Sequence, residues 1–121
     1  PASVTEKWGT DHRMIAGKAS VRTLAQGANA WLGMLTLAPE MDVPLHRDPT
    51  EEYIVVIEGG GTIWIDGKKY ILAPGDTAFM PTGAQVRFRN GARETTVFQV
   101  FAGPQSAQKY KAWAVNPAKD D

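Results

Sequence analysis

The stretch PLHRDPTEEYIVVIEGGG, residues 44–61, contains the strongest signals for the fold. Residues 52–57 are apolar and rich in β-branched side chains, which is typical of a strand, and three consecutive glycines then indicate a turn. His46, one of the two histidines of the chain, precedes this run. Asp48 follows two positions after His46, and Glu52 is the first residue of the run. The same stretch therefore predicts a strand and supplies the first candidates for a functional site.

On both sides of this stretch, short apolar or alternating segments are separated by turns rich in glycine and proline. Asp66-Gly67 is a strong signal for a two-residue β-hairpin. No segment between residues 20 and 101 keeps a helical period for long. The predicted strands cover residues 18–24, 30–37, 52–57, 62–65, 68–72, 77–80, 85–90 and 95–101. The pattern predicts an all-β sandwich or barrel, and a jelly roll is the natural closed form.

The length of 121 residues predicts a single domain. We expect an N-terminal arm over residues 1–17 and a β-barrel domain over residues 18–103. A polar C-terminal tail follows over residues 104–121, and it carries Tyr110 and Trp113, two aromatic residues that could pack on the domain.

Composition excludes several classes of function. Net charge is zero, with 13 basic and 13 acidic residues, so there is no basic surface for nucleic acid. The chain has no cysteine, which excludes disulfides, thiolate metal sites and a cysteine nucleophile. No apolar run approaches the roughly 20 residues of a membrane span. The sequence starts at Pro1 without methionine, which fits either methionine removal or a cleaved leader, so the compartment stays open.

His46 and Asp48 are two positions apart, which places both side chains on one face if they lie on a strand. Glu52 can add a second carboxylate from the start of the next strand. Imidazole and carboxylate ligands suit divalent ions such as Zn, Fe, Mn or Ni. Without a metal, the same three groups could perform acid–base chemistry. The alternative is a solvated loop, because Asp48-Pro49-Thr50 has the composition of a turn.

The strand predicted over residues 85–90 alternates, with Val86 and Phe88 on one face and Arg87 and Arg89 on the other. We expect the two arginines to form a solvated outer face. If the orientation were reversed, Arg87 would line the interior, where it could bind a carboxylate.

Other polar and aromatic residues are weaker candidates. His12 has no partner in the sequence, and we expect it at the surface. Trp31, Trp64 and Phe88 are expected in the core, or as a stacking surface for a flat ligand. Gln99 stands alone among apolar neighbours, so it either faces solvent or lines a cavity.

These residues resemble the two sequence motifs of the cupin superfamily. The first motif matches as His46-Arg47-Asp48, three residues, Glu52, six residues, Gly59. The second motif matches as Gly75, five residues, Pro81-Thr82-Gly83, two residues, Val86, three residues, Asn90. The resemblance covers roughly residues 30–101 and implies a cupin-type double-stranded β-helix, which is a jelly-roll barrel. It also implies a homodimer, since small cupins are commonly dimers.

In this family the metal ligands are two histidines and the glutamate of the first motif and one histidine of the second. Here His46 and Glu52 match, Asp48 stands in place of the second histidine, and Val86 stands in place of the last. The resemblance therefore implies an oxygen-rich site with a single nitrogen ligand. Waters would complete the coordination of Mn, Fe, Ni or Zn.

Three functional hypotheses follow. In the first, a metal held by His46, Asp48 and Glu52 acts as a Lewis acid on a small oxygenated substrate. In the second, the barrel is free of metal and binds a sugar or an aromatic acid. His46 and Glu52 then bind the ligand, or act as acid and base in an isomerase or lyase. In the third, the protein is a non-catalytic dimer. We expect no nucleic acid and no membrane as a partner.

Overall fold

The structure, a computed structural model, describes residues 1–106 and 108–115. Its elements in chain order are β1 (His12–Ile15), β2 (Ala19–Gln26), β3 (Ala30–Leu37), β4 (Asp42–Arg47), β5 (Glu51–Glu58), β6 (Gly61–Ile65), β7 (Lys68–Leu72), β8 (Thr77–Met80), β9 (Gln85–Asn90), β10 (Thr95–Ala102), the 3-10 helix η1 (Gln108–Ala112) and β11 (Ala114–Val115).

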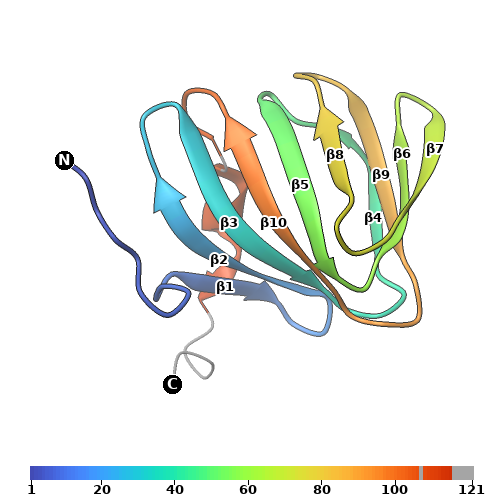
Figure 1. Ribbon diagram of the computed structural model, residues 1–121, viewed down its shortest axis with the longest axis horizontal. Helices are drawn as coiled ribbons and strands as arrows, with labels where there is room; N and C mark the ends of the chain where they lie inside the picture. The colour runs from blue at the N-terminus through green and yellow to red at the C-terminus, as the bar shows by residue number, and fades with distance from the viewer. Residues whose placement is uncertain (107, 116–121) are drawn as a thin grey trace.

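The strands form two antiparallel sheets (Figure 1). One sheet has seven strands in the order β11-β1-β2-β3-β10-β5-β8, and the other has four in the order β4-β9-β6-β7. This arrangement confirms the predicted all-β jelly-roll barrel. The predicted strands are all present, whereas β4 was not predicted and lies directly before the functional candidates.

Backbone geometry explains two of the predicted turns. Asp66 and Gly67 both have positive φ, at 50° and 82°, as a type I′ hairpin turn between β6 and β7 requires. Gly59 has a φ of 82°, and a Cβ atom there would lie 2.4 Å from the carbonyl oxygen of Glu94. The first glycine of the 59–61 run is therefore needed for close approach of the backbone at the end of β5.

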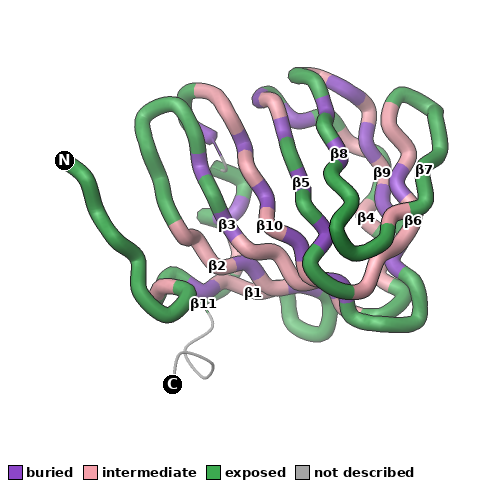
Figure 2. The backbone as a smooth tube through the Cα atoms, viewed as in Figure 1, coloured by how far each residue is buried: buried purple, intermediate pink, exposed green. Residues whose placement is uncertain are grey.

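Burial alternates along the strands, as expected when one sheet face lines a core (Figure 2). On β9, Val86 and Phe88 are buried, which confirms the predicted orientation of this strand. On β10, Val97, Gln99 and Phe101 are buried. Gln99 therefore faces the interior, one of the two alternatives that its sequence context left open.

A buried asparagine, Asn90, links several segments at one end of the barrel through side-chain hydrogen bonds. Asn90 donates from its side-chain nitrogen to the carbonyl oxygens of Leu37 at 3.2 Å, Ala38 at 2.8 Å and Arg93 at 3.0 Å. Its oxygen accepts from the Thr95 hydroxyl at 2.6 Å. The last residue of the second motif thus joins the ends of β3 and β9 to the turn before β10.

The arm and the tail meet at the edge of the larger sheet. β1 belongs to the predicted arm and β11 to the predicted tail, and β1 pairs with both β2 and β11. His12, expected at the surface, is only 6% exposed because β1 is covered as part of this sheet. Residue 107 and residues 116–121 of the predicted tail lie outside the described residues. In the described part of the chain, no helix has the length and apolar character to cross a membrane.

The outer face of the seven-stranded sheet carries several exposed apolar side chains. Tyr53 and Val55 on β5 and Phe79 on β8 are exposed there, and Phe98 on β10 is half-buried. The pairing of β5 with β8 and β10 brings these residues side by side. Trp8 of the arm packs on Phe98, with ring centroids 6.2 Å apart.

Candidate functional site

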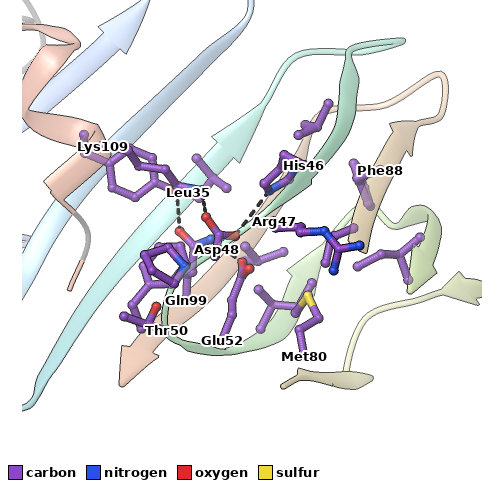
Figure 3. A pocket seen from close by; sticks show the side chains of 18 of the residues that line it. Leu35, His46, Arg47, Asp48, Thr50, Glu52, Met80, Phe88, Gln99 and Lys109 are labelled. Atoms are coloured by element: carbon purple, nitrogen blue, oxygen red, sulfur yellow. Dashed lines mark hydrogen bonds and ion pairs between the residues drawn. The ribbon is translucent and has the colours of Figure 1, made fainter. Parts of the chain in front are cut away.

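The passage of the chain from one sheet to the other builds the polar mouth of the barrel. β4 belongs to the four-stranded sheet and carries His46, whereas β5 belongs to the seven-stranded sheet and carries Glu52. Asp48 lies in the connection between them, after the end of β4. Its buried side chain lies beside that of His46, so the structure brings the three predicted residues together, although Asp48 is not on the strand (Figure 3).

Asp48 is 9% exposed and lies between two cationic groups. Lys109 donates to its Oδ1 at 2.9 Å, and its Oδ2 lies 3.3 Å from His46 Nε2. This second contact has ion-pair distance but poor hydrogen-bond geometry, since Oδ2 has no well-aligned donor among the described residues. Burial alone would raise the pKa of Asp48. The contacts with His46 and Lys109 outweigh it and hold this pKa well below its usual range.

The protonation of His46 follows from its two neighbours. Its Nδ1 lies 2.8 Å from the carbonyl oxygen of Pro44, and because a carbonyl only accepts, Nδ1 carries a hydrogen. Its Nε2 faces Asp48. The contact with Asp48 raises the pKa of His46, and burial opposes this effect. The imidazolium form is therefore favoured beside the carboxylate.

The pKa of Glu52 is shifted in the opposite direction to that of Asp48. It is 7% exposed, and Gln99 donates to its Oε2 at 2.6 Å. Burial raises the pKa of Glu52 to about 7, with a further contribution from the adjacent Asp48, while Gln99 and Lys109 oppose it. Two carboxyl groups at one mouth thus differ in protonation near neutral pH: Asp48 is ionised, and Glu52 is poised between its neutral and ionised forms.

The C-terminal tail completes the site from the far end of the sequence. Tyr110 on η1 donates its hydroxyl to Gln99 Oε1 at 2.7 Å, which orients the Gln99 amide toward Glu52. The Tyr110 ring packs against Trp31, Phe101 and Trp113, at centroid distances of 5.3, 6.1 and 4.8 Å. Burial raises the pKa of Tyr110 well above its ordinary value.

Lys109 was missed by the sequence reasoning, although it lies on the tail that was expected to pack. No spacing rule links it to Asp48, because the two residues are 61 positions apart. A lysine next to a buried tyrosine in a polar tail carries no signal of its own.

A cavity of about 570 Å³ extends from this mouth into the barrel. Its interior is lined by apolar side chains, including Leu37, Ile54, Ile63, Val86, Phe88 and Val97. The predicted pocket residues Val86, Phe88 and Gln99 all line it, together with His46, Asp48 and Glu52. The volume is sufficient for a small organic ligand.

The two predicted pocket tryptophans lie elsewhere, which corrects that expectation. Trp31 packs in a separate aromatic cluster and donates from Nε1 to the Thr23 hydroxyl at 3.1 Å. It lines a smaller neighbouring pocket instead. Trp64 lies under the guanidinium of Arg87, whose central carbon is 4.6 Å from the ring centroid. Arg87 also pairs with Asp42 at 3.4 Å, on the outer face predicted for it.

The side chains at the mouth do not fit a metal ion as they are arranged. Within residues 1–106 and 108–115, no three histidine, cysteine, aspartate or glutamate side chains are grouped to hold one. The ammonium group of Lys109 already faces Asp48, where a metal would need that carboxylate. Val86 faces the cavity and offers no ligand atom. The predicted metal site stays a prediction.

Comparison with known families settles the classification. The profile of the Cupin domain family matches residues 33–101, more than half of the chain. The chain belongs to the cupin family. No curated protein matches the sequence.

Several solved structures share the fold at low identity. An RmlC-like cupin from Shewanella frigidimarina has a TM-score of 0.76 at 15% identity, covering 88% of this chain and 95% of that one. KdgF from a Halomonas species has a TM-score of 0.77 at 15% identity, covering 88% and 97%. The polyketide cyclase RemF from Streptomyces resistomycificus has a TM-score of 0.72 at 18% identity, covering 84% and 80%. These likenesses support the fold alone.

Proposed function

We propose that this cupin binds a small, largely apolar oxygenated molecule and moves a proton on it through Glu52, without a metal. The observation that carries this proposal is the pair of carboxyl groups at the mouth. Asp48 is kept ionised by His46 and Lys109, whereas burial keeps Glu52 partly protonated near neutral pH. Carboxyl pairs with pKa values pushed apart are typical of sites that separate acid and base roles.

Glu52 suits either direction of proton transfer. A group with a pKa of about 7 is present in both forms near neutral pH, so it can accept a proton and return it. In the proposed step, ionised Glu52 takes a proton from the carbon between a carbonyl group and a carbon–carbon double bond. The electron pair of that C–H bond forms a new double bond to the carbonyl carbon, and the carbonyl π pair moves to oxygen, which gives a dienolate. Neutral Glu52 then returns the proton to the far carbon of the original double bond while the carbonyl re-forms, so the net result is an isomerisation. If the carbon next to the deprotonated carbon instead carries a leaving group, that group departs with its bonding pair and the reaction is an elimination.

Gln99 and Tyr110 support this role by holding Glu52 in place. Gln99 Nε2 donates to one carboxyl oxygen, Oε2, which leaves Oε1 to carry and transfer the proton. Tyr110 fixes the Gln99 amide through its oxygen. A carboxyl group held in one orientation exposes the same atom to every ligand that enters the cavity.

The fold neighbours are compatible with this proposal but do not select a substrate. RemF is described as a polyketide cyclase, and a Thermotoga maritima neighbour is described as a predicted oxalate decarboxylase. Cupin folds thus occur in proteins described by quite different reactions, and function has to be argued from the residues of each site.

The proposal can be tested before the natural substrate is known. The protein is incubated in deuterium oxide with a panel of apolar aldehydes, ketones and esters, and exchange of hydrogen at the carbon next to the carbonyl is followed by NMR. We expect accelerated exchange for a subset of compounds, and loss of this acceleration in Glu52→Gln. Glu51→Gln is the matched control, because Glu51 is the neighbouring acid and does not line the cavity. Equal exchange in wild type and Glu52→Gln would overturn the proposal.

A further inference from the structure

We propose that the ligand is an apolar carboxylic acid, whose carboxylate binds Lys109 at the mouth and whose apolar body fills the barrel. This inference rests on the proposed function, because it assigns the chemical class of the molecule that the same site binds. Two features of the structure support it: the cationic side chains at the mouth, above all Lys109, and the apolar character of the interior.

Two cationic side chains, Arg47 and Lys109, line the cavity at its mouth. Lys109 contacts Asp48, whereas the guanidinium of Arg47 donates to the carbonyl oxygen of Gly83, which is a neutral acceptor. A cationic group at the mouth of a cavity attracts an anionic ligand more strongly than a neutral or cationic one.

Lys109 is placed to contact a ligand at the entrance. Its side chain is 42% exposed, and its ammonium nitrogen lies 4.9 Å from the Phe101 ring centroid. An ammonium group has three hydrogens, and the hydrogen bond to Asp48 uses one of them. A ligand carboxylate at the mouth can therefore accept from Lys109 while the contact with Asp48 is kept.

The interior excludes strongly hydroxylated ligands. Beyond the mouth, the cavity is lined by side chains such as Ile54, Ile63, Val86 and Val97, which neither donate nor accept hydrogen bonds. Val86 occupies the position at which the resemblance would place a histidine. Sugar hydroxyls buried against these side chains would lose hydrogen bonds to water without replacement. Of the two ligand classes that the sequence left open, the aromatic or otherwise apolar acid therefore fits better than the sugar.

An anion at the mouth would also change the protonation of Glu52. The charged or titratable groups that act on Glu52 are Asp48, Lys109 and Tyr110. A further negative charge beside them favours the neutral form of Glu52. Binding of an acid above about pH 7 should therefore take up a proton, whereas binding of a neutral analogue should not.

The test compares matched probes by isothermal titration calorimetry. The probes are 2-naphthoate, its neutral isostere 2-naphthamide, and glucuronate as a hydroxylated acid. At about pH 6, we expect 2-naphthoate to bind at least about tenfold more tightly than 2-naphthamide, as a charge-assisted hydrogen bond predicts, and glucuronate to bind most weakly. At about pH 8, titrations in buffers of different ionisation enthalpy should show proton uptake for the acid alone.

Two variants test whether Lys109 is the residue that causes the preference for the acid. Lys109→Gln should lose the preference for the acid while keeping its affinity for 2-naphthamide, which also shows that the barrel is folded. Lys111→Gln should keep the preference, because Lys111 is on the same helix but does not line the barrel cavity.

The two possible failures are distinguishable. Equal affinity for acid and amide in wild type, or an unchanged preference in Lys109→Gln, would overturn the acid class while leaving small-molecule binding intact. Failure of every probe, neutral ones included, together with absence of deuterium exchange in the carbonyl panel, would overturn the proposed function as well.

Discussion

The ammonium nitrogen of Lys109 lies 2.9 Å from Asp48 Oδ1, although the two residues are 61 positions apart in the sequence. This contact joins the tail of the chain to the turn between β4 and β5. Together with His46, Lys109 keeps the pKa of Asp48 below its usual range, whereas burial raises the pKa of Glu52.

Replacing Lys109 with methionine should destabilise the protein in a manner that depends on pH. Because the folded-state pKa of Asp48 is lowered, its contribution to stability is complete above the ordinary carboxyl pKa and is lost as pH falls below it. We expect a loss of about 1 kcal/mol at neutral pH, a modest value because Lys109 is partly exposed. The difference should shrink below about pH 3. Chemical denaturation of both proteins across this range measures it, and a difference independent of pH would contradict the assignment.

Glu52→Gln should stabilise the protein at alkaline pH. The folded-state pKa of about 7 lies above the unfolded value, so the wild type loses stability as pH rises between the two and stays lower above pH 7. Glutamine can still accept the hydrogen bond from Gln99 and carries no charge. We expect the variant to be more stable by about 2 to 3 kcal/mol at about pH 8 and nearly equal to wild type at about pH 4. Urea unfolding at both pH values checks this. A variant less stable at pH 8 would show that Glu52 is not poised as proposed.

Elemental analysis of protein purified without an affinity tag separates the metal-free proposal from the metal site predicted by resemblance. We expect metal far below one atom per chain in wild type and in His46→Ala alike, and no thermal stabilisation by added Mn, Fe, Ni or Zn. Near-stoichiometric metal that disappears in His46→Ala would instead establish a site of one histidine and two carboxylates.

Asn90→Ala should lower the free energy of unfolding, because Asn90 links segments at one end of the barrel. The change removes donors to three backbone carbonyl groups in a position that is almost completely buried. Unsatisfied buried carbonyls make a loss of about 2 to 4 kcal/mol the expected result. Thermal unfolding measures it, with Asn29→Ala as a control at an exposed turn. An equal effect of both substitutions would contradict the role given to Asn90.

The homodimer expected from the resemblance is a further prediction. The exposed apolar residues on the outer face of the seven-stranded sheet support it, because large exposed apolar patches often mark interfaces. Val55→Lys on that face should shift the protein toward monomer in light scattering. Ile71→Lys, at an exposed site on the other sheet, should leave the oligomeric state unchanged. If the wild-type protein is a monomer in light scattering, the prediction of a homodimer is wrong.

Local signals in the sequence predicted most of the fold. The Asp66-Gly67 turn depends on the conformational preferences of two adjacent residues, and the orientation of Val86 and Phe88 depends on strand alternation. The candidate site was found in part, because His46, Asp48 and Glu52 lie within seven residues of one another.

Contacts between distant segments explain what the sequence did not reveal. Lys109 and Tyr110 reach the site only through the packing of the tail on the barrel. His12 is buried because β1 pairs between β2 and β11, and the short β11 has no pattern of its own. Trp31 and Trp64 were assigned to the cavity on residue type, but strand orientation and neighbouring layers decide which side of a sheet such residues occupy.

Lys109 and Tyr110 lie beyond residue 101, where the match to the Cupin domain family ends. Relatives aligned over the family region alone can therefore share strands β4 to β9 and still differ at the positions of Lys109 and Tyr110. Annotation transferred by domain boundaries would overlook this difference. A shortened protein cut at those boundaries would keep Asp48 with His46 and Glu52 with Gln99, but it would lose Lys109 and Tyr110.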